Sequence, residues 1–308
     1  MKKITALLVS IILIMTLAAC SVIPAATTST TETSSQNAPE MAATSESATT
    51  ASQPAAATDP ASAIIYQDIH EDASDYVWDA AAVVPMTLDG NTITTSGAGV
   101  SINGSVANIT AAGVYSLSGT LTDGQIVVNA PDDAVVQLIL NGVNLNNSKG
   151  SPLVIEEADK AILILAENTQ NVISDSSAYV FASADTDEPN AAIFSKSDLT
   201  IYGSGALTVT GNYNDGIASK DGLLIASGTV SVTALDDGIR GKDYVAIKDG
   251  TITISSQGDG LKSDNEEETD RGFITIAGGT ITITSGADAV QAAKEVFVTS
   301  GALTLVTG

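Results

Sequence analysis

The last third of the chain repeats a short apolar strand pattern, and this repetition limits the fold more than any other feature of the sequence. One tripeptide alternates apolar residues with Thr or Ser, at Leu207–Val209, Val230–Val232, Ile252–Ile254, Ile281–Ile283 and Leu303–Leu305. A second apolar tripeptide precedes each of these, at Leu199–Ile201, Leu223–Ile225, Val245–Ile247, Ile274–Ile276 and Val296–Val298. A third short strand carries, in turn, Ile217, Ile239, Leu261 and Val290. Most repeats are therefore about 22 residues long and hold three short strands.

Three strands in about 22 residues fit one coil of a parallel β-helix, whose coils stack at about 4.8 Å. Inward apolar residues then form ladders that bury a core with few aromatic side chains, which suits an aromatic content of 4%. Propellers need longer antiparallel repeats, and leucine-rich repeats need their own Leu and Asn spacing. The sequence therefore predicts an all-β solenoid, with less regular coils over residues 90–175. No capping element follows the last strand before Gly308, so either the sequence is a fragment or the solenoid lacks a cap.

The N-terminus predicts export and a lipid anchor. Lys2 and Lys3 precede an apolar run of signal-peptide length, which ends in small residues before Cys20. We expect residues 1–19 to be a lipoprotein signal peptide and Cys20 to carry lipid. Residues 20–62 are rich in Ser, Thr, Ala and Pro and predict a disordered linker. Residues 63–308 would form the β-helix domain, held outside the cell membrane as is typical of Gram-positive lipoproteins.

The charge of the chain limits its partners. Its 36 acidic and 12 basic residues give a net charge of −24, which disfavours nucleic acid and anionic lipid. Neutral glycans, cations and anionic glycans bridged by a cation remain compatible with such a surface. The lone Cys20 excludes an intramolecular disulfide and a cysteine-based metal site.

Acidic residues recur at fixed positions of the repeat. An Asp-Gly motif places Asp215, Asp237, Asp259 and the weaker match Asp288 in one column along the axis, whereas Ala191 occupies this position in the preceding coil. The other candidate ligands near these turns are Asp221, Asp236, Asp243, Asp264 and Asn265. Stacked carboxylates repel unless a cation lies between them, and Ca²⁺ takes six to eight hard oxygen ligands.

Two roles without a metal stay open for the Asp columns. Asp-Gly is a common turn dipeptide, so stacked Asp residues also serve by accepting hydrogen bonds from turn amides. Nearby basic residues neutralise carboxylates without a metal; these are Lys220, Arg240, Lys242 and Lys262. Different coils can use different solutions.

Candidate sugar-binding residues lie beside the same turns. Tyr213 and Tyr244 are aromatic platforms or packing residues, and the candidate polar contacts are Arg240, Lys242 and Lys262. Catalytic groups are scarce, because His70 is the only histidine and lies outside the repeats. Trp78 also lies outside them and favours a cap over the N-terminal end of the solenoid.

These motifs resemble the clostridial carbohydrate-binding domain-containing lipoproteins. The similarity covers nearly all of residues 64–308, and the strings that carry it are His70–Asp72, Asp75–Asp79, Leu117–Gln125, Leu140–Val143, Asn212–Ile217 and Asp236–Asp243. It implies a right-handed parallel β-helix, related in fold to pectate lyases, that binds calcium and plant cell-wall glycans such as cellulose and acidic pectin. It also implies that Asp215, Asp237 and Asp259 are calcium ligands.

We therefore expect a cell-surface, calcium-binding, non-catalytic protein that binds cell-wall polysaccharide. One alternative is a calcium-dependent polysaccharide lyase, in which Arg240, Lys242 or Lys262 removes the proton beside a uronate carboxylate. The other is a structural adhesin or spacer in which calcium only stabilises the solenoid.

Overall fold

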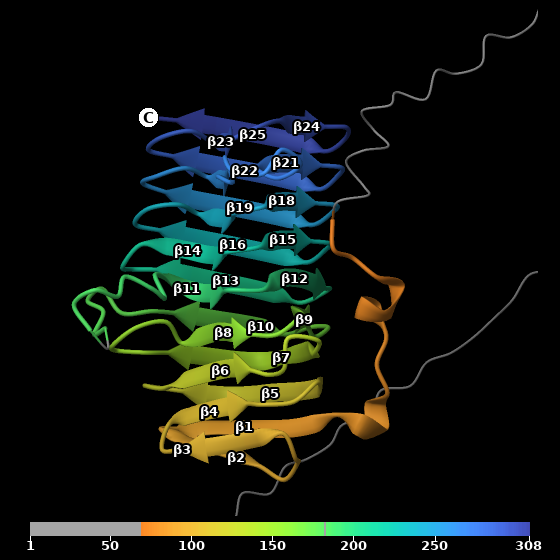
Figure 1. The fold of residues 1–308 in the computed structure, drawn as a ribbon, viewed down its shortest axis with the longest axis vertical. Coiled ribbons are helices and arrows are strands. Elements are labelled where there is room, and N and C mark those ends of the chain that lie inside the picture. The colour runs from red at the N-terminus through yellow and green to blue at the C-terminus, as the bar shows by residue number, and fades with distance from the viewer. Residues whose placement is uncertain (1–68, 182) are drawn as a thin grey trace, which may run out of the picture. The chain divides into compact units, whose positions relative to one another are not determined.

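The computed structural model describes residues 69–181 and 183–308, which form an all-β stack of coils (Figure 1). The predicted signal peptide, Cys20 and the linker over residues 20–62 lie outside the described residues. Two short 3₁₀ helices, η1 (Ala73–Tyr76) and η2 (Ala80–Ala82), precede the strands. Within the described ranges, no helix has the length and apolar character needed to cross a membrane.

One face of the stack is a nine-stranded sheet, whose order in the described part is β23-β20-β17-β14-β11-β8-β6-β4-β3. Its strands are β3 (Val100–Asn103), β4 (Val106–Ile109), β6 (Gln125–Asn129), β8 (Leu153–Glu157), β11 (Ala191–Ser195), β14 (Asp215–Ser219), β17 (Ile239–Gly241), β20 (Leu261–Ser263) and β23 (Val290–Ala292). All its pairs are parallel except β3 with β4. We call this sheet the short-strand sheet.

The rest of the wall is a 16-stranded sheet with two arms that meet at the long strand β7. The first strands and one arm are β1 (Val84–Gly90), β2 (Thr92–Thr95), β5 (Gly113–Leu121), β7 (Val135–Asn146), β9 (Lys160–Leu165), β12 (Asp198–Gly203), β15 (Gly222–Ile225), β18 (Tyr244–Ile247), β21 (Phe273–Ile276) and β24 (Val296–Val298). The other arm is β10 (Gln170–Ser174), β13 (Ala206–Gly211), β16 (Thr229–Ala234), β19 (Thr251–Ser256), β22 (Thr280–Ser285) and β25 (Ala302–Thr307). Each regular coil thus supplies three strands, as the repeats predicted.

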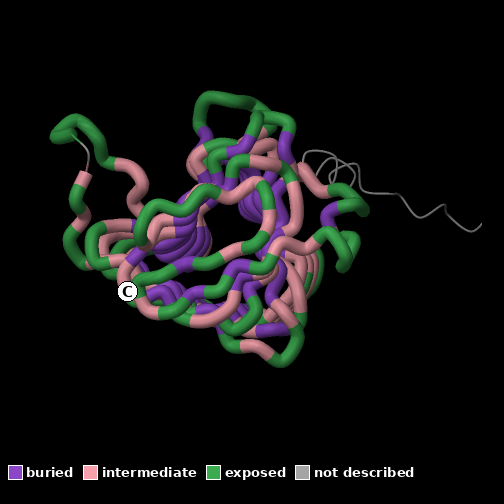
Figure 2. The backbone as a smooth tube through the Cα atoms, turned by 90° about the horizontal axis from the view of Figure 1, so that it is seen from below, coloured by how far each residue is buried: buried purple, intermediate pink, exposed green. Residues whose placement is uncertain are grey.

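The core consists of apolar ladders along the axis. Ile217 pairs with Ile239 and Ile239 with Leu261, each fully buried, in the register that the repeats predicted. Val, Ile and Thr suit these strands because their branched side chains pack well on a pleated surface. Figure 2 looks along the stack and shows the buried segments gathered on its inner side. At about 25 cal/mol per Å² of buried apolar area, such continuous ladders are the main source of stability.

The N-terminal end of the stack is closed by antiparallel strands. β1 pairs with β2 and β3 with β4 in antiparallel register, whereas the coils above them pair in parallel. Antiparallel hairpins fold an edge back on itself and so limit pairing with another chain. This end cap is built from residues 84–109 rather than from the segment that contains Trp78.

Residues 69–82, which we call the strap, run along the side of the stack (Figure 1). The strap is fixed by Asp75, whose Oδ2 lies 2.8 Å from Lys160 Nζ, and by Glu71, whose Oε2 lies 2.9 Å from Lys248 Nζ. The expectation that the region of Trp78 caps the solenoid end is wrong, because these contacts reach strands far apart in the stack. Trp78 keeps 38% of its surface exposed.

Candidate functional site

The predicted column of aspartates forms a hydrogen-bonded ladder at the start of the short strands. Asp215 Oδ1 accepts from the Asp237 amide at 3.1 Å, and Asp237 Oδ1 accepts from the Asp259 amide at 2.8 Å. Asp259 Oδ1 in turn accepts from the Asp288 amide at 2.9 Å. Each carboxylate therefore satisfies a turn amide of the next coil, as turn capping requires. Ala191 pairs with Asp215 and ends the column, in the position that the repeats predicted.

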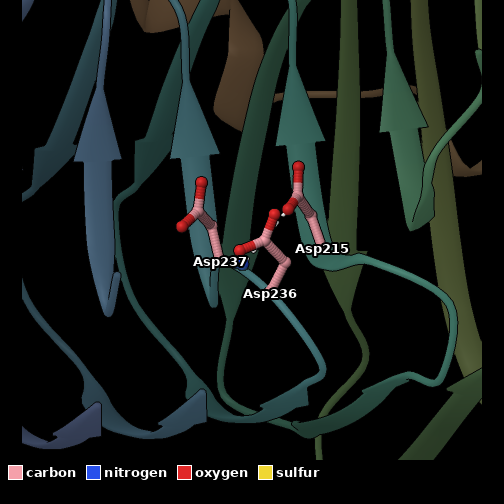
Figure 3. Close-up of side chains that lie close together, drawn as sticks. All are labelled: Asp215, Asp236 and Asp237. Carbon is pink, nitrogen blue, oxygen red and sulfur yellow. Dashed lines mark hydrogen bonds between the residues drawn. The ribbon is translucent and has the colours of Figure 1, made fainter. Parts of the chain in front are cut away.

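Among the described residues, one group of carboxylates has the spacing of a metal site. Asp215, Asp236 and Asp237 each place an oxygen within 4.8 Å of the others, and we call them the Asp cluster. Figure 3 shows the Asp236 carboxyl group reaching toward that of Asp215. Asp215 and Asp237 are buried, whereas Asp236 is exposed to solvent. The cluster is thus open to solvent at Asp236 and enclosed by protein at Asp215 and Asp237.

Asp215 is the most deeply buried residue of the Asp cluster. Its side chain is fully buried, and its Oδ2 has no hydrogen-bond partner among the described residues. Burial, together with the charge of Asp237, raises the pKa of Asp215 to about 7. Burial also raises the pKa of Asp236. An orphaned buried carboxylate oxygen beside two further carboxylates fits a hard cation such as Ca²⁺, which prefers oxygen ligands.

Basic side chains neutralise other parts of the column. Lys262 Nζ lies 3.0 Å from both Asp237 Oδ2 and Asp259 Oδ2. One terminal nitrogen of Arg240 lies 2.5 Å from Asp264 Oδ2, and the other lies 3.8 Å from Asp215 Oδ2. Lys262 therefore neutralises Asp259 without a metal. Arg240 pairs mainly with Asp264 and forms only a longer ion pair with Asp215.

The other predicted metal ligands are not brought into a metal cluster within the described ranges. Asn265 Nδ2 donates to Asp243 Oδ1 at 2.7 Å, and Arg271 Nε lies 3.4 Å from Asp243 Oδ2. Burial, with the charges of Asp198 and Asp243, raises the pKa of Asp221 to about 6. In this second column, Asp221 contacts Asp243, and an amide and a guanidinium group contact Asp243.

The strap meets this second column at a cavity of about 430 Å³ that the sequence did not indicate. His70 Nδ1 lies 2.6 Å from Asp198 Oδ2, and the His70 amide donates to the Tyr244 hydroxyl group at 3.0 Å. The sequence did not indicate these contacts of His70. No local pattern encodes them, because 174 residues separate His70 from Tyr244.

The predicted sugar-binding residues differ in their access to a ligand. Tyr213 is half-buried and stacks on Tyr179, with ring centroids 4.2 Å apart. Tyr244 is only 2% exposed and packs on Phe273, so its ring offers no face to a sugar, contrary to the expectation from sequence. Lys242 is half-buried and, within the described part of the chain, makes no side-chain hydrogen bond or ion pair.

Comparison with known proteins agrees with this geometry. A carbohydrate-binding domain-containing protein of Acetivibrio thermocellus is 40% identical over 136 residues, which cover 44% of this chain and 48% of that protein. The chain thus matches about half the length of this relative. The solved structure of the polysaccharide lyase-like protein from C. thermocellum, a gadolinium derivative, superposes with a TM-score of 0.67 and 34% identity, covering 73% of this chain and 94% of that one. A family model described as carbohydrate-binding domain-containing protein matches residues 103–308, and the chain therefore belongs to this family.

Proposed function

We propose that this protein binds acidic cell-wall polysaccharide without cleaving it, on the outward face of the short-strand sheet, with Ca²⁺ held by the Asp cluster. The observation that carries the proposal is a row of basic side chains directly beside that cluster, in a chain whose net charge is −24. Arg240 and Lys262 of this row are paired with carboxylates of the protein, so a polyanion would bind there by competing with those carboxylates.

The basic row follows from the strand register. Arg240 pairs with Lys262 across β17 and β20, on the face opposite to the buried ladder of Ile239 and Leu261. A second column of lysines lies just past the ends of β11, β14 and β17, and the backbone amides of these lysines continue the hydrogen bonding between coils. We include them in the basic row; they are Lys196, Lys220 and Lys242. A repeating row of cations one coil apart suits a polymer of repeating anionic sugars, because each coil contacts a further sugar unit.

Calcium would connect the carboxylates of the Asp cluster to the carboxylates of the glycan. Asp215, Asp236 and Asp237 supply three of the six to eight oxygens that Ca²⁺ takes, and uronate oxygens would supply others. Bridging of carboxylates by the ion would make binding depend on calcium.

The chemistry of the basic row favours binding over a lyase reaction. A lyase base must be unprotonated to remove a proton. Burial works against the charge of Lys262, yet hydrogen bonds to Asp237 and Asp259 raise its pKa to about 12, so it stays protonated. Burial also works against the charge of Arg240, but the hydrogen bond to Asp264 and the charges of Asp264, Asp215 and Asp237 together raise its pKa. Release of unsaturated uronic products from pectin would support the lyase alternative, for which Lys242 is the remaining candidate base.

Retention of the calcium-loaded protein on pectate coupled covalently to a resin and on insoluble cellulose tests the proposal. We expect retention on pectate that a chelator abolishes, with no soluble sugar released. A double variant, Lys220→Gln with Lys242→Gln, should weaken binding to pectate about tenfold, equal to about 1.4 kcal/mol. The matched variant Lys294→Gln removes an exposed charge outside the row and should bind normally. Absence of pectate binding by the calcium-loaded protein would refute the proposal in favour of a structural adhesin or spacer.

We also propose that Cys20 carries the lipid that anchors the protein to the outer face of the cell membrane, with residues 20–62 as the spacer. This rests on the small residues before Cys20 and the composition of the linker. Metabolic labelling with a radioactive fatty acid should label the wild-type protein and not the Cys20→Ser variant. Equal labelling of both would exclude this anchor.

A further inference from the structure

A cavity of about 350 Å³ lies between the short-strand sheet and the connection from β10 to β11. It is separate from the Asp cluster and from the basic row. Tyr179, Val180 and Phe181 form its aromatic and apolar wall, and Gln125, Asn147 and Lys149 supply polar groups on the opposite strands and turns. This size lies within the range of small-molecule sites, which combine apolar walls with a few fixed polar groups.

The aromatic wall is held in place without a ligand. Tyr179 stacks on Tyr213 at 4.2 Å with an interplanar angle of 18°, and Phe181 lies with its centroid 5.8 Å from that of Tyr179. The Tyr179 hydroxyl group donates to Asp175 Oδ2 at 2.6 Å, and the Val180 amide donates to the Lys149 carbonyl group at 2.8 Å. Because Tyr213 covers one face of the Tyr179 ring and does not line the cavity, the cavity borders the rest of that ring.

Gly150 keeps the floor beside this ring open. A Cβ atom at Gly150 would have a single neighbour within 4 Å, Tyr179 Cδ2 at 4.0 Å. Its backbone does not adopt a positive φ, so a larger side chain is tolerated by the main chain there. A side chain at this position would therefore enter the cavity rather than strain the fold.

The carboxylates on the rim of this cavity are neutralised by lysines. Glu156 Oε2 lies 2.5 Å from Lys196 Nζ, and Glu188 Oε1 lies 2.6 Å from Lys220 Nζ, so both carboxylates of the rim are paired. The amides of Gln125 and Asn147 are oriented by the Ser151 carbonyl oxygen, at 2.8 and 3.1 Å. Fixed amides beside an aromatic ring suit the hydroxyl groups and the apolar face of an uncharged sugar.

We propose that this cavity is a second carbohydrate subsite, which holds a neutral hexopyranose ring against Tyr179 and Phe181. The inference rests on the proposed polysaccharide-binding function and adds a subsite for uncharged sugar units. The ion pair of Glu188 with Lys220 joins the rim of the cavity to the basic row. One polysaccharide chain with neutral and acidic units thus contacts both sites.

Isothermal titration calorimetry of the full-length, calcium-loaded protein tests this, with cellohexaose as the neutral probe and a hexamer of galacturonate as the acidic probe. We expect both probes to bind. Gly150→Leu should fill the cavity and weaken cellohexaose binding at least about tenfold, while the affinity for the acidic probe stays unchanged. Thr253→Leu introduces the same leucine side chain at an exposed position of β19 and should leave both affinities unchanged.

A second pair of variants guards against misfolding. Tyr179→Phe retains the ring and should bind cellohexaose nearly as well as the wild type, whereas Tyr179→Ala should not. If the wild-type protein binds only the acidic probe, or if Gly150→Leu binds cellohexaose normally, the subsite is refuted while the proposed function stands. If the wild-type protein binds neither probe, both the subsite and the proposed function are refuted.

Discussion

Replacing Asp215 by Asn should remove the contribution of this residue to the pH dependence of stability. Asp215 is fully buried, and its pKa is raised from 3.8 to about 7 by burial and by the charge of Asp237. A carboxyl group whose pKa is raised by folding stabilises the folded state while protonated. This contribution is fully present below pH 3.8 and is lost as the pH rises through 7. The shift corresponds to a free energy on the order of 4 kcal/mol.

In the absence of metal, the asparagine side chain of this variant keeps an oxygen that accepts from the Asp237 amide and carries no charge. The free energy of unfolding of Asp215→Asn, minus that of the wild type, should therefore rise by on the order of 4 kcal/mol between pH 4 and pH 8. Urea unfolding in a chelator at several pH values measures this difference. Asp249→Asn, at an exposed turn, should give the same pH dependence as the wild type.

Calcium should narrow this difference in stability at pH 8. A ligand at 100 times its dissociation constant stabilises the folded state by about 2.7 kcal/mol, and the variant lacks the carboxylate that would bind it. The wild type should gain this stability and Asp215→Asn should gain little. If the two proteins show the same pH dependence in chelator, the buried carboxylate does not titrate as argued. If both respond equally to calcium, the ion binds elsewhere.

Three further substitutions test the fold around the site. Ile239→Ala removes a fully buried rung of the core ladder and should cost about 2–5 kcal/mol in urea unfolding, whereas the exposed Thr253→Ala should cost less than about 0.5 kcal/mol. Lys160→Met leaves the buried Asp75 carboxylate unpaired and should cost about 3–5 kcal/mol, with earlier proteolysis of the strap. Tyr244→Phe should cost about 1 kcal/mol through its lost hydroxyl group and leave polysaccharide retention unchanged; weaker retention would give this hydroxyl group a role in binding.

The sequence predicted the coils and the Asp column because a solenoid turns spacing along the chain into position in space. Once Ile217, Ile239 and Leu261 are recognised as equivalent, every residue near them acquires a neighbour in the next coil. The ladder of Asp215 and Asp237 follows from this register alone. Periodicity therefore carries most of the information about the site.

What the sequence did not indicate lies outside the periodic positions. The contact of His70 with Asp198 and the pair of Lys160 with Asp75 depend on the path of the strap, which no repeat specifies. The burial of Tyr244 depends in part on the strap, whose His70 amide contacts its hydroxyl group, while Phe273 is its neighbour in the next coil. Tyr179 meets Tyr213 only because the irregular connection before β11 folds back on the sheet. Such contacts bridge residues far apart in the chain, so local patterns do not encode them.

The distribution of cations along the column explains why one turn is the best place for calcium. Lys262 serves Asp237 and Asp259 at 3.0 Å each, so a metal there would compete with an ammonium group already in place. At the preceding turn Arg240 is drawn toward Asp264, which leaves the buried Oδ2 of Asp215 without a hydrogen bond. A uronate bound to Arg240 would weaken the ion pair of Arg240 with Asp264. The carboxylate oxygens of the uronate would complete the coordination of the proposed calcium ion. Calcium and acidic glycan should therefore bind cooperatively, each raising the affinity for the other by the same factor.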